Sequence, residues 1–146
     1  MCGTWLIKDA MNGANEVDWC CLIETGWLSD MKTELKQRVA AYVRDGSDVK
    51  SFYVGITSGN SVELALRRRY DTYKRDNGFN VMVCVYQSSS QNLVRDAEAI
   101  LVEHFKGNPK NANLTGGGGG NISNGPNHYL YLALRYWPKN FTCRNR

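Results

Sequence analysis

Residues 52–73 read FYVGITSGNSVELALRRRYDTY, and this stretch decides the fold because it predicts a strand, a turn and a basic helix in succession. Successive side chains of an extended segment alternate between two faces. One face therefore carries three apolar residues: Phe52, Val54 and Ile56. The other carries Tyr53 and Gly55, and a glycine inside a strand is typical of a backbone that a ligand or another segment approaches closely. We expect one core face and one face that offers a phenol beside bare backbone.

The helix after the turn carries a run of arginines that suits a bound phosphate. Asn60 or Ser61 is expected to cap its first turn. Arg69 and Tyr73 are four residues apart, which places both on one face of the helix. Together with the phenol and the glycine of the strand, they predict a phosphate-binding site. On these residues alone, a strand packed by its aromatic side chains and followed by a solvated basic helix remains the alternative.

A candidate acidic residue follows in the next predicted helix, residues 92–106, which comes after an apolar run at 81–86 that predicts a buried strand. At about 100° per residue, the apolar side chains of this helix form one stripe. Glu98 lies at the edge of that stripe beside Phe105, whereas Glu103 projects well away from it. A carboxylate at the rim of a core is typical of a metal-binding or catalytic acid. We therefore take Glu98 as the candidate, with an ordinary solvated glutamate as the alternative, and expect Glu103 to be solvated.

The order of these elements resembles the GIY-YIG nucleases over about residues 50 to 115. The resemblance implies that Tyr53-Val54-Gly55 is the second half of the motif that names the family. It also implies a role for each matching residue: Arg69 as the helix arginine, Tyr73 as the aromatic or histidine that follows it, Glu98 as the metal-binding glutamate, and Asn111 or Asn113 as the late asparagine. Because the turn after Gly55 is a few residues longer than in the simplest members, Arg67 and Arg68 remain alternatives to Arg69.

The first half of the family motif has two candidate positions. Ala40-Ala41-Tyr42 stands at about the expected distance before Tyr53, with alanine in place of glycine. However, Tyr42 continues an apolar repeat at helical spacing that begins behind two candidate caps, Ser29 and Asp30, and this repeat predicts a helix with Tyr42 in its core. Gly3-Thr4-Trp5 is the other candidate and requires a long insertion before Tyr53. If neither position serves, one aromatic residue of the family site is absent.

The chemistry that the resemblance implies is hydrolysis of a phosphodiester. The site would use one divalent metal, Mg²⁺ or Mn²⁺, held by Glu98 and largely by water and substrate oxygens. The arginine would stabilise the equatorial phosphoryl oxygens, and Tyr73 would complete the phosphate pocket. Tyr53 would orient or deprotonate the attacking water, although an unperturbed phenol has a pKa near ~10. Further substrate contacts are expected from five residues: Gly55, Arg67, Arg68, Lys74 and Asn113.

Composition is compatible with this interpretation. The chain of 146 residues is 42% hydrophobic, which is enough for one well-buried domain. We expect an α+β fold, a small and mostly antiparallel sheet flanked by helices, with its core at about residues 40–137 and an N-terminal extension at 1–30. The net charge of +4 is modest, but basic residues cluster at 67–69, 74–75, 106–110 and 139–146. Such clusters favour polyanions, so the predicted partner is nucleic acid, expected to be DNA, with little sequence specificity.

The sequence leaves two other functions and the location of the protein open. A catalytically silent relative would bind nucleic acid through the same basic face, and a secreted cytotoxic protein is compatible with either activity. No signal peptide or membrane span is visible, but Asn-x-Ser/Thr sequons begin at Asn113, Asn121 and Asn140. Four cysteines would form two disulfides in a secreted protein: Cys2, Cys20, Cys21 and Cys143. Cys84 is expected in the core, and the spacing of cysteines and histidines does not predict structural zinc.

Overall fold

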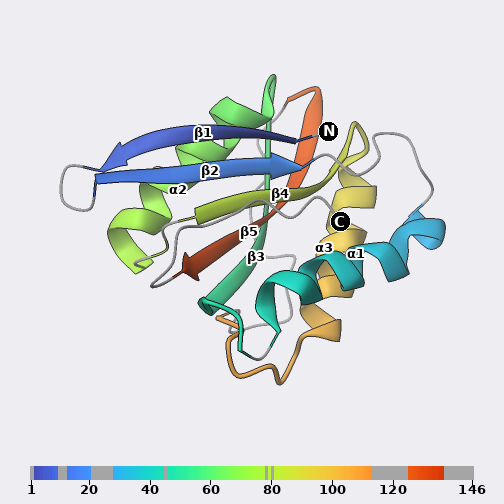
Figure 1. Cartoon of the computed structure of the whole chain (residues 1–146). Helices are drawn as coiled ribbons and strands as arrows, with labels where there is room; N and C mark the ends of the chain where they lie inside the picture. The colour runs from blue at the N-terminus through green and yellow to red at the C-terminus, as the bar shows by residue number, and fades with distance from the viewer. Residues whose placement is uncertain are drawn as a thin grey trace.

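Among the residues that the computed structural model describes, five strands form one sheet and three helices pack against it (Figure 1). The described residues are 2–9, 13–20, 28–44, 46–77, 79, 81–112 and 125–136, with side chains described for 32–44, 46–69, 79, 81–112 and 125–135. The elements follow in this order: β1 (Cys2–Asp9), β2 (Gly13–Cys20), α1 (Leu28–Val43), β3 (Val49–Gly59), α2 (Val62–Asn77), β4 (Val81–Ser88), α3 (Gln91–His104) and β5 (Asn127–Tyr136).

The strands lie in the order β1-β2-β4-β5-β3. β4, β5 and β3 are antiparallel neighbours, β1 and β2 form an antiparallel pair, and β2 runs parallel to β4. The last strand in the sequence therefore lies between β4 and β3, and β3 is an edge strand. The predicted α+β class, with a small and mostly antiparallel sheet flanked by helices, is confirmed. The segment predicted as an N-terminal extension contributes β1 and β2 to the same sheet.

Alternation along the strands divides the core into two layers. On one face of the sheet, here called the α3 face, α1 and α3 pack against alternate residues of β3, β4 and β5, such as Val54 and Leu132. On the opposite α2 face, α2 packs against the intervening residues, such as Met82 and Tyr131. β4 and β5 are buried on both sides, so their near-continuous apolar sequences follow from their central position. β5 lies between β4 and β3, and both of its faces are covered.

Local sequence predicts the first turn of α2 correctly but not that of α1. Ser61 Oγ accepts a hydrogen bond from Leu64 N at 3.2 Å, so Ser61 caps α2 as expected. The prediction for α1 is wrong by a few residues. Its backbone is already helical at Leu28, so the candidate caps Ser29 and Asp30 lie inside the helix. Capping preferences locate a helix end only to within one or two residues, because neighbouring polar side chains compete for the same role.

A segment after α3 covers one end of the β3 edge. Phe52 N donates to Lys110 O at 2.9 Å, and Ala112 N donates to Phe52 O at 2.8 Å. The ammonium of Lys110 donates in turn to Arg44 O at 2.8 Å and to Ser47 Oγ at 3.1 Å, just beyond the end of α1. Lys110 belongs to a basic cluster in the sequence, but in the fold it holds the α1–β3 connection against the segment that follows α3.

Three polar residues lie side by side on neighbouring strands at one end of the α3 face. His128 of β5 is in register with Ser58 of β3 and Ser88 of β4, and all three are buried. His128 Nδ1 is hydrogen-bonded to Ser58 Oγ at 2.6 Å. Burial lowers the pKa of His128 below its ordinary value of 6.5, and the positive charge of Arg95 on α3 lowers it further. The folded protein therefore favours the neutral imidazole.

This depressed pKa predicts an acid-dependent loss of stability. The unfolded chain takes up a proton on His128 at a higher pH than the folded chain does. The stabilisation is thus complete above about pH 6.5 and is lost as the pH falls through the pKa of the folded state. His128→Asn removes the titrating group. As the pH is lowered, the free energy of unfolding of this variant should therefore decrease less than that of the parent chain. Urea denaturation between about pH 7 and pH 5 measures this difference. Parallel decreases for both proteins would contradict the prediction.

Candidate functional site

Tyr53 and Gly55 lie on the α2 face of β3, as the alternation predicts. Tyr53 is partly exposed and packs at the margin of the apolar layer under α2. Gly55 is buried and is paired directly with Tyr131 of β5. A Cβ added to Gly55 would lie 2.5 Å from Tyr131 Oη, 2.6 Å from Tyr131 Cζ and 3.0 Å from Tyr53 Cε1. The close approach that the glycine indicates is therefore made by Tyr131, a residue that the sequence analysis did not include in the site.

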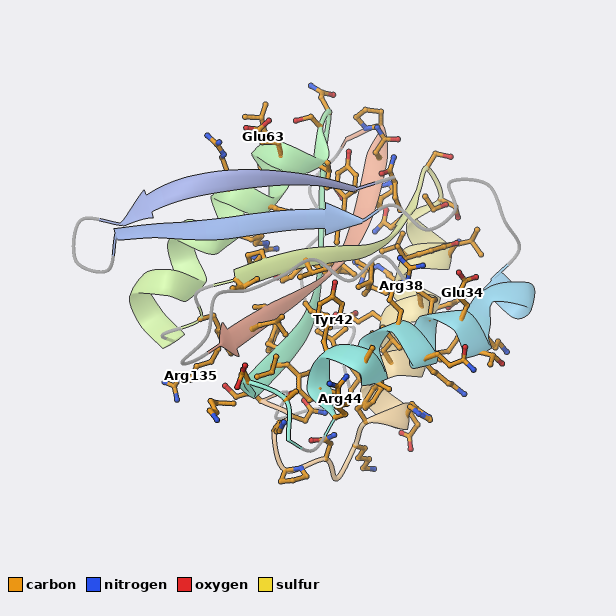
Figure 2. The ribbon with its side chains drawn as sticks, in the orientation of Figure 1. Glu34, Arg38, Tyr42, Arg44, Glu63 and Arg135 are labelled. Atoms are coloured by element: carbon orange, nitrogen blue, oxygen red, sulfur yellow. The ribbon has the colours of Figure 1, made fainter. Side chains whose placement is uncertain are left out.

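The three consecutive arginines of α2 point in different directions. Arg67 is exposed and forms an ion pair with Glu63 at 2.9 Å, one turn earlier on the helix; Glu63 itself lies at the outer surface in Figure 2. Arg68 is also exposed, but its Nη2 donates to Ser58 O at the end of β3 at 2.8 Å. Arg69 is partly buried and continues the helical stripe that packs on the sheet through Leu66. Of the three, Arg69 thus lies on the same side as Tyr53.

These contacts predict that Arg67 and Arg68 contribute unequally to stability. Arg68→Ala removes a charge-assisted hydrogen bond to Ser58 O and should lower the free energy of unfolding by about 1 kcal/mol. Arg67→Ala removes only an exposed ion pair within the helix, which is worth about 0.3–0.5 kcal/mol. Urea denaturation of both variants measures the difference, since each removes one guanidinium from the same helix. Equal losses would contradict the assigned contact of Arg68.

Glu98 and Glu103 differ in burial in the way that the helical periodicity predicts. Glu98 is 4% exposed and lies among the buried residues of α3, between Val94 and Val102. Glu103 is exposed. Of the acidic residues whose side chains the structure describes, Glu98 is the only one that is buried. A buried carboxylate is costly unless it is paired, hydrogen-bonded or bound to a metal, and Glu98 does interact with other groups of the fold.

The fold divides the predicted site residues between the two faces of the sheet. Tyr53 and Arg69 belong to the α2 face, whereas Glu98 is carried by α3, which packs on the opposite face. The two faces meet along β3, because β3 is the edge strand. The Glu98 carboxylate and the Tyr53 phenol could therefore contact the same substrate only if that substrate passes around the β3 edge. The edge is bordered by residues 110–112 at one end and by Arg68 at the other.

Neither candidate for the first family motif lies beside Tyr53. Ala40-Ala41-Tyr42 belongs to α1, and Tyr42 is 3% exposed and points from this helix toward the sheet (Figure 2). The prediction that Tyr42 is a core residue of a helix is confirmed. Gly3-Thr4-Trp5 does begin a strand, but β1 is at the edge of the sheet opposite to β3. Four strand spacings of about 4.8 Å separate these edges by roughly 19 Å.

Several other predicted site residues lie wholly or partly outside the described part of the chain. Tyr73 and Lys74 belong to the helical backbone of α2, but their side chains are not among those described. Asn113 lies outside the described residues. The alternative late asparagine, Asn111, is described, and its Nδ2 donates to Phe105 O at 3.1 Å. This bond satisfies a carbonyl at the C-terminal end of α3, which is a structural role for the Asn111 amide.

The described side chains contain no group of three or more histidine, cysteine or acidic residues that would bind a metal ion together. A metal site with one carboxylate and mainly water ligands does not need three protein ligands. A glutamate oxygen is a ligand that Mg²⁺ and Mn²⁺ accept. The donor chemistry of Glu98 therefore fits such a metal. Cys84 is a buried free thiol, as expected for a core residue. The side chains of the other four cysteines lie outside the described part.

Comparisons with known proteins assign no family to this chain. No protein-family model, curated protein or solved structure matches it. A hypothesis about the site therefore depends on its residues and their geometry alone. Within the described ranges, no helix is long and apolar enough to cross a membrane.

Proposed function

We propose that this protein is a metal-dependent endonuclease of the GIY-YIG type that hydrolyses phosphodiester bonds of nucleic acid, expected to be DNA. The observation that carries the proposal is the partial burial of Arg69 one turn after Leu66, which packs on the α2 face together with Tyr53. A guanidinium binds phosphate by charge-assisted hydrogen bonds, and a phenol on the same face can donate a further one. The other two arginines of the run point elsewhere, Arg67 to Glu63 and Arg68 to Ser58 O at the end of β3.

The proposed mechanism assigns a separate catalytic, metal-binding or electrostatic role to each of these residues. Arg69 stabilises negative charge on the equatorial phosphoryl oxygens, and Tyr53 orients the attacking water through its hydroxyl. Tyr73 completes the phosphate pocket from the next turn of α2. Glu98 would hold a divalent cation, Mg²⁺ or Mn²⁺, and such a cation would neutralise charge on the phosphate and lower the pKa of bound water. Exposed Arg67, Arg68 and Lys106 contribute electrostatic attraction at the periphery.

A catalytically silent nucleic-acid-binding protein is the second candidate. The observation that favours it is the separation of Glu98, on the helix of the α3 face, from Tyr53 and Arg69 on the α2 face. Such a protein would bind the same polymers through α2 without metal-dependent cutting. Incubation with supercoiled plasmid DNA and with single-stranded RNA, in Mg²⁺ and in chelator, separates the two candidates. Nicking that requires Mg²⁺ supports the nuclease, and binding without nicking supports the silent protein.

A substitution of Glu98 tests the metal-binding role directly. Glu98→Gln keeps the shape of the side chain but removes its charge, so Mg²⁺-dependent nicking should be abolished while DNA binding is retained. Glu103→Gln is the matched control, because it makes the same change on the exposed side of α3 and should be nearly silent. Initial rates of plasmid nicking and a gel-shift assay in chelator measure the two properties. Equal loss from both substitutions, or from neither, would reject the assignment.

The distribution of positive charge predicts the salt dependence of binding. If about three to five basic side chains around α2 and Lys106 neutralise phosphates, the slope of log affinity against log salt should be about −3 to −4.5 on duplex DNA. Binding should be largely indifferent to sequence, since phosphate contacts carry no base information. Fluorescence anisotropy with two duplexes of unrelated sequence, titrated with salt, measures both properties. A slope near zero would mean that these side chains are ordinary solvated surface.

A further inference from the structure

The side chain of Tyr131 on β5 lies directly over the backbone of Gly55 on β3. The two residues face each other across the β3-β5 ladder. The position that a Cβ on Gly55 would take lies 2.5 Å from Tyr131 Oη and 2.6 Å from Tyr131 Cζ. These distances are too short for any side chain at position 55, so the phenol end of Tyr131 occupies the space that the glycine leaves open. The glycine is thus required by Tyr131.

The same space adjoins the ring of Tyr53. Tyr53 Cε1 lies 3.0 Å from that Cβ position, so the rings of Tyr53 and Tyr131 approach Gly55 from two sides. Tyr131 is 1% exposed and fixed by the apolar layer of the α2 face, whereas Tyr53 is partly exposed. Because Gly55 has no side chain, the end of the Tyr131 ring occupies this space and limits the part of it that is left to the Tyr53 ring. The buried tyrosine is therefore in a position to determine where the exposed one lies.

We propose that Tyr131 is a positioning residue that holds the Tyr53 ring, and with it the Tyr53 hydroxyl, in place for the phosphate; this inference rests on the proposed nuclease function. Tyr131 itself is too deeply buried to contact a polymer. Its hydroxyl and ring end fill the space over Gly55 that the ring edge of Tyr53 also borders. A misplacement of about 1 Å of a substrate-positioning group can cost on the order of 10²-fold in rate, so a support of this kind has a measurable effect.

Tyr129 provides a matched control on the same strand. It lies two residues before Tyr131, faces the same α2 layer and is equally buried at 1% exposure. It is in register with Thr57, not with Gly55, and it is not among the atoms nearest to the Gly55 Cβ position. Tyr129→Phe and Tyr131→Phe therefore remove the same hydroxyl from equivalent surroundings. They differ in whether that hydroxyl lies over Gly55.

The experiment measures kcat and KM for Mg²⁺-dependent nicking of a plasmid by the full chain and by four variants: Tyr53→Phe, Tyr129→Phe, Tyr131→Phe and the double variant Tyr53→Phe/Tyr131→Phe. We expect Tyr131→Phe to lower kcat by about tenfold with little change in KM, and Tyr129→Phe to resemble the parent. Because Tyr131 acts through the Tyr53 hydroxyl, the double variant should be no slower than Tyr53→Phe alone. Assays below the melting temperature of the least stable variant separate these effects from unfolding.

Three results would overturn the inference and leave the proposed function intact. They are a Tyr131→Phe variant as active as the parent, a loss as large in Tyr129→Phe, and a double variant whose loss is the product of the two single losses. The last result would mean that Tyr131 acts independently of Tyr53. By contrast, absence of Mg²⁺-dependent nicking by the parent chain itself would overturn the proposed function and the inference together.

Discussion

The antiparallel ladder between β3 and β5 is the interaction on which the rest of the structure depends. It joins Val49–Gly59 to the last strand of the described chain, across about 70 residues in the case of Ser58 and His128. Since β5 also pairs with β4, the ladder makes β3 part of the sheet and leaves it at the edge. It also sets which side chains meet: Tyr131 over Gly55, and His128 beside Ser58. A shift of β3 by one residue would move its side chains to the opposite face and separate both of these pairs.

Much of the local structure could be predicted from the sequence, because it is encoded by short-range patterns. Alternation placed Tyr53 and Gly55 on one face of a strand, and helical periodicity distinguished buried Glu98 from exposed Glu103. The partner of Gly55 could not be predicted, because the register between β3 and β5 is a property of segments far apart in the chain. The sequence signal was present nevertheless, since a glycine inside an edge strand is often covered by an aromatic residue from the neighbouring strand. For the same reason, the position of β1 at the opposite edge could not be inferred from its sequence.

The edge position of β3 also determines what a site at this strand can contain. Helices on opposite faces of a sheet are separated by the thickness of the sheet, so α2 and α3 cannot supply groups to one ligand through its centre. At an edge strand this barrier ends, and groups from both faces can approach the same side of the backbone. The ends of this edge are bordered by the Phe52 hydrogen bonds to residues 110 and 112 and by the Arg68 contact with Ser58 O. The proposed joint site for Glu98 and Arg69 would therefore have to lie between these two ends, along the part of β3 that carries Tyr53 and Gly55.

The arginine run illustrates why a cluster in sequence differs from a cluster in space. Consecutive helical residues are rotated by about 100°, so three neighbours cannot all face one ligand. In α2 this rotation sends Arg67 to Glu63, Arg68 to the end of β3 and Arg69 to the sheet-facing stripe. The first contributes mainly to the electrostatic field, the second stabilises the strand that carries Tyr53, and the third is directed to the face where Tyr53 and Gly55 lie. A single substitution within this run therefore changes one of three distinct properties, even though each removes the same charge.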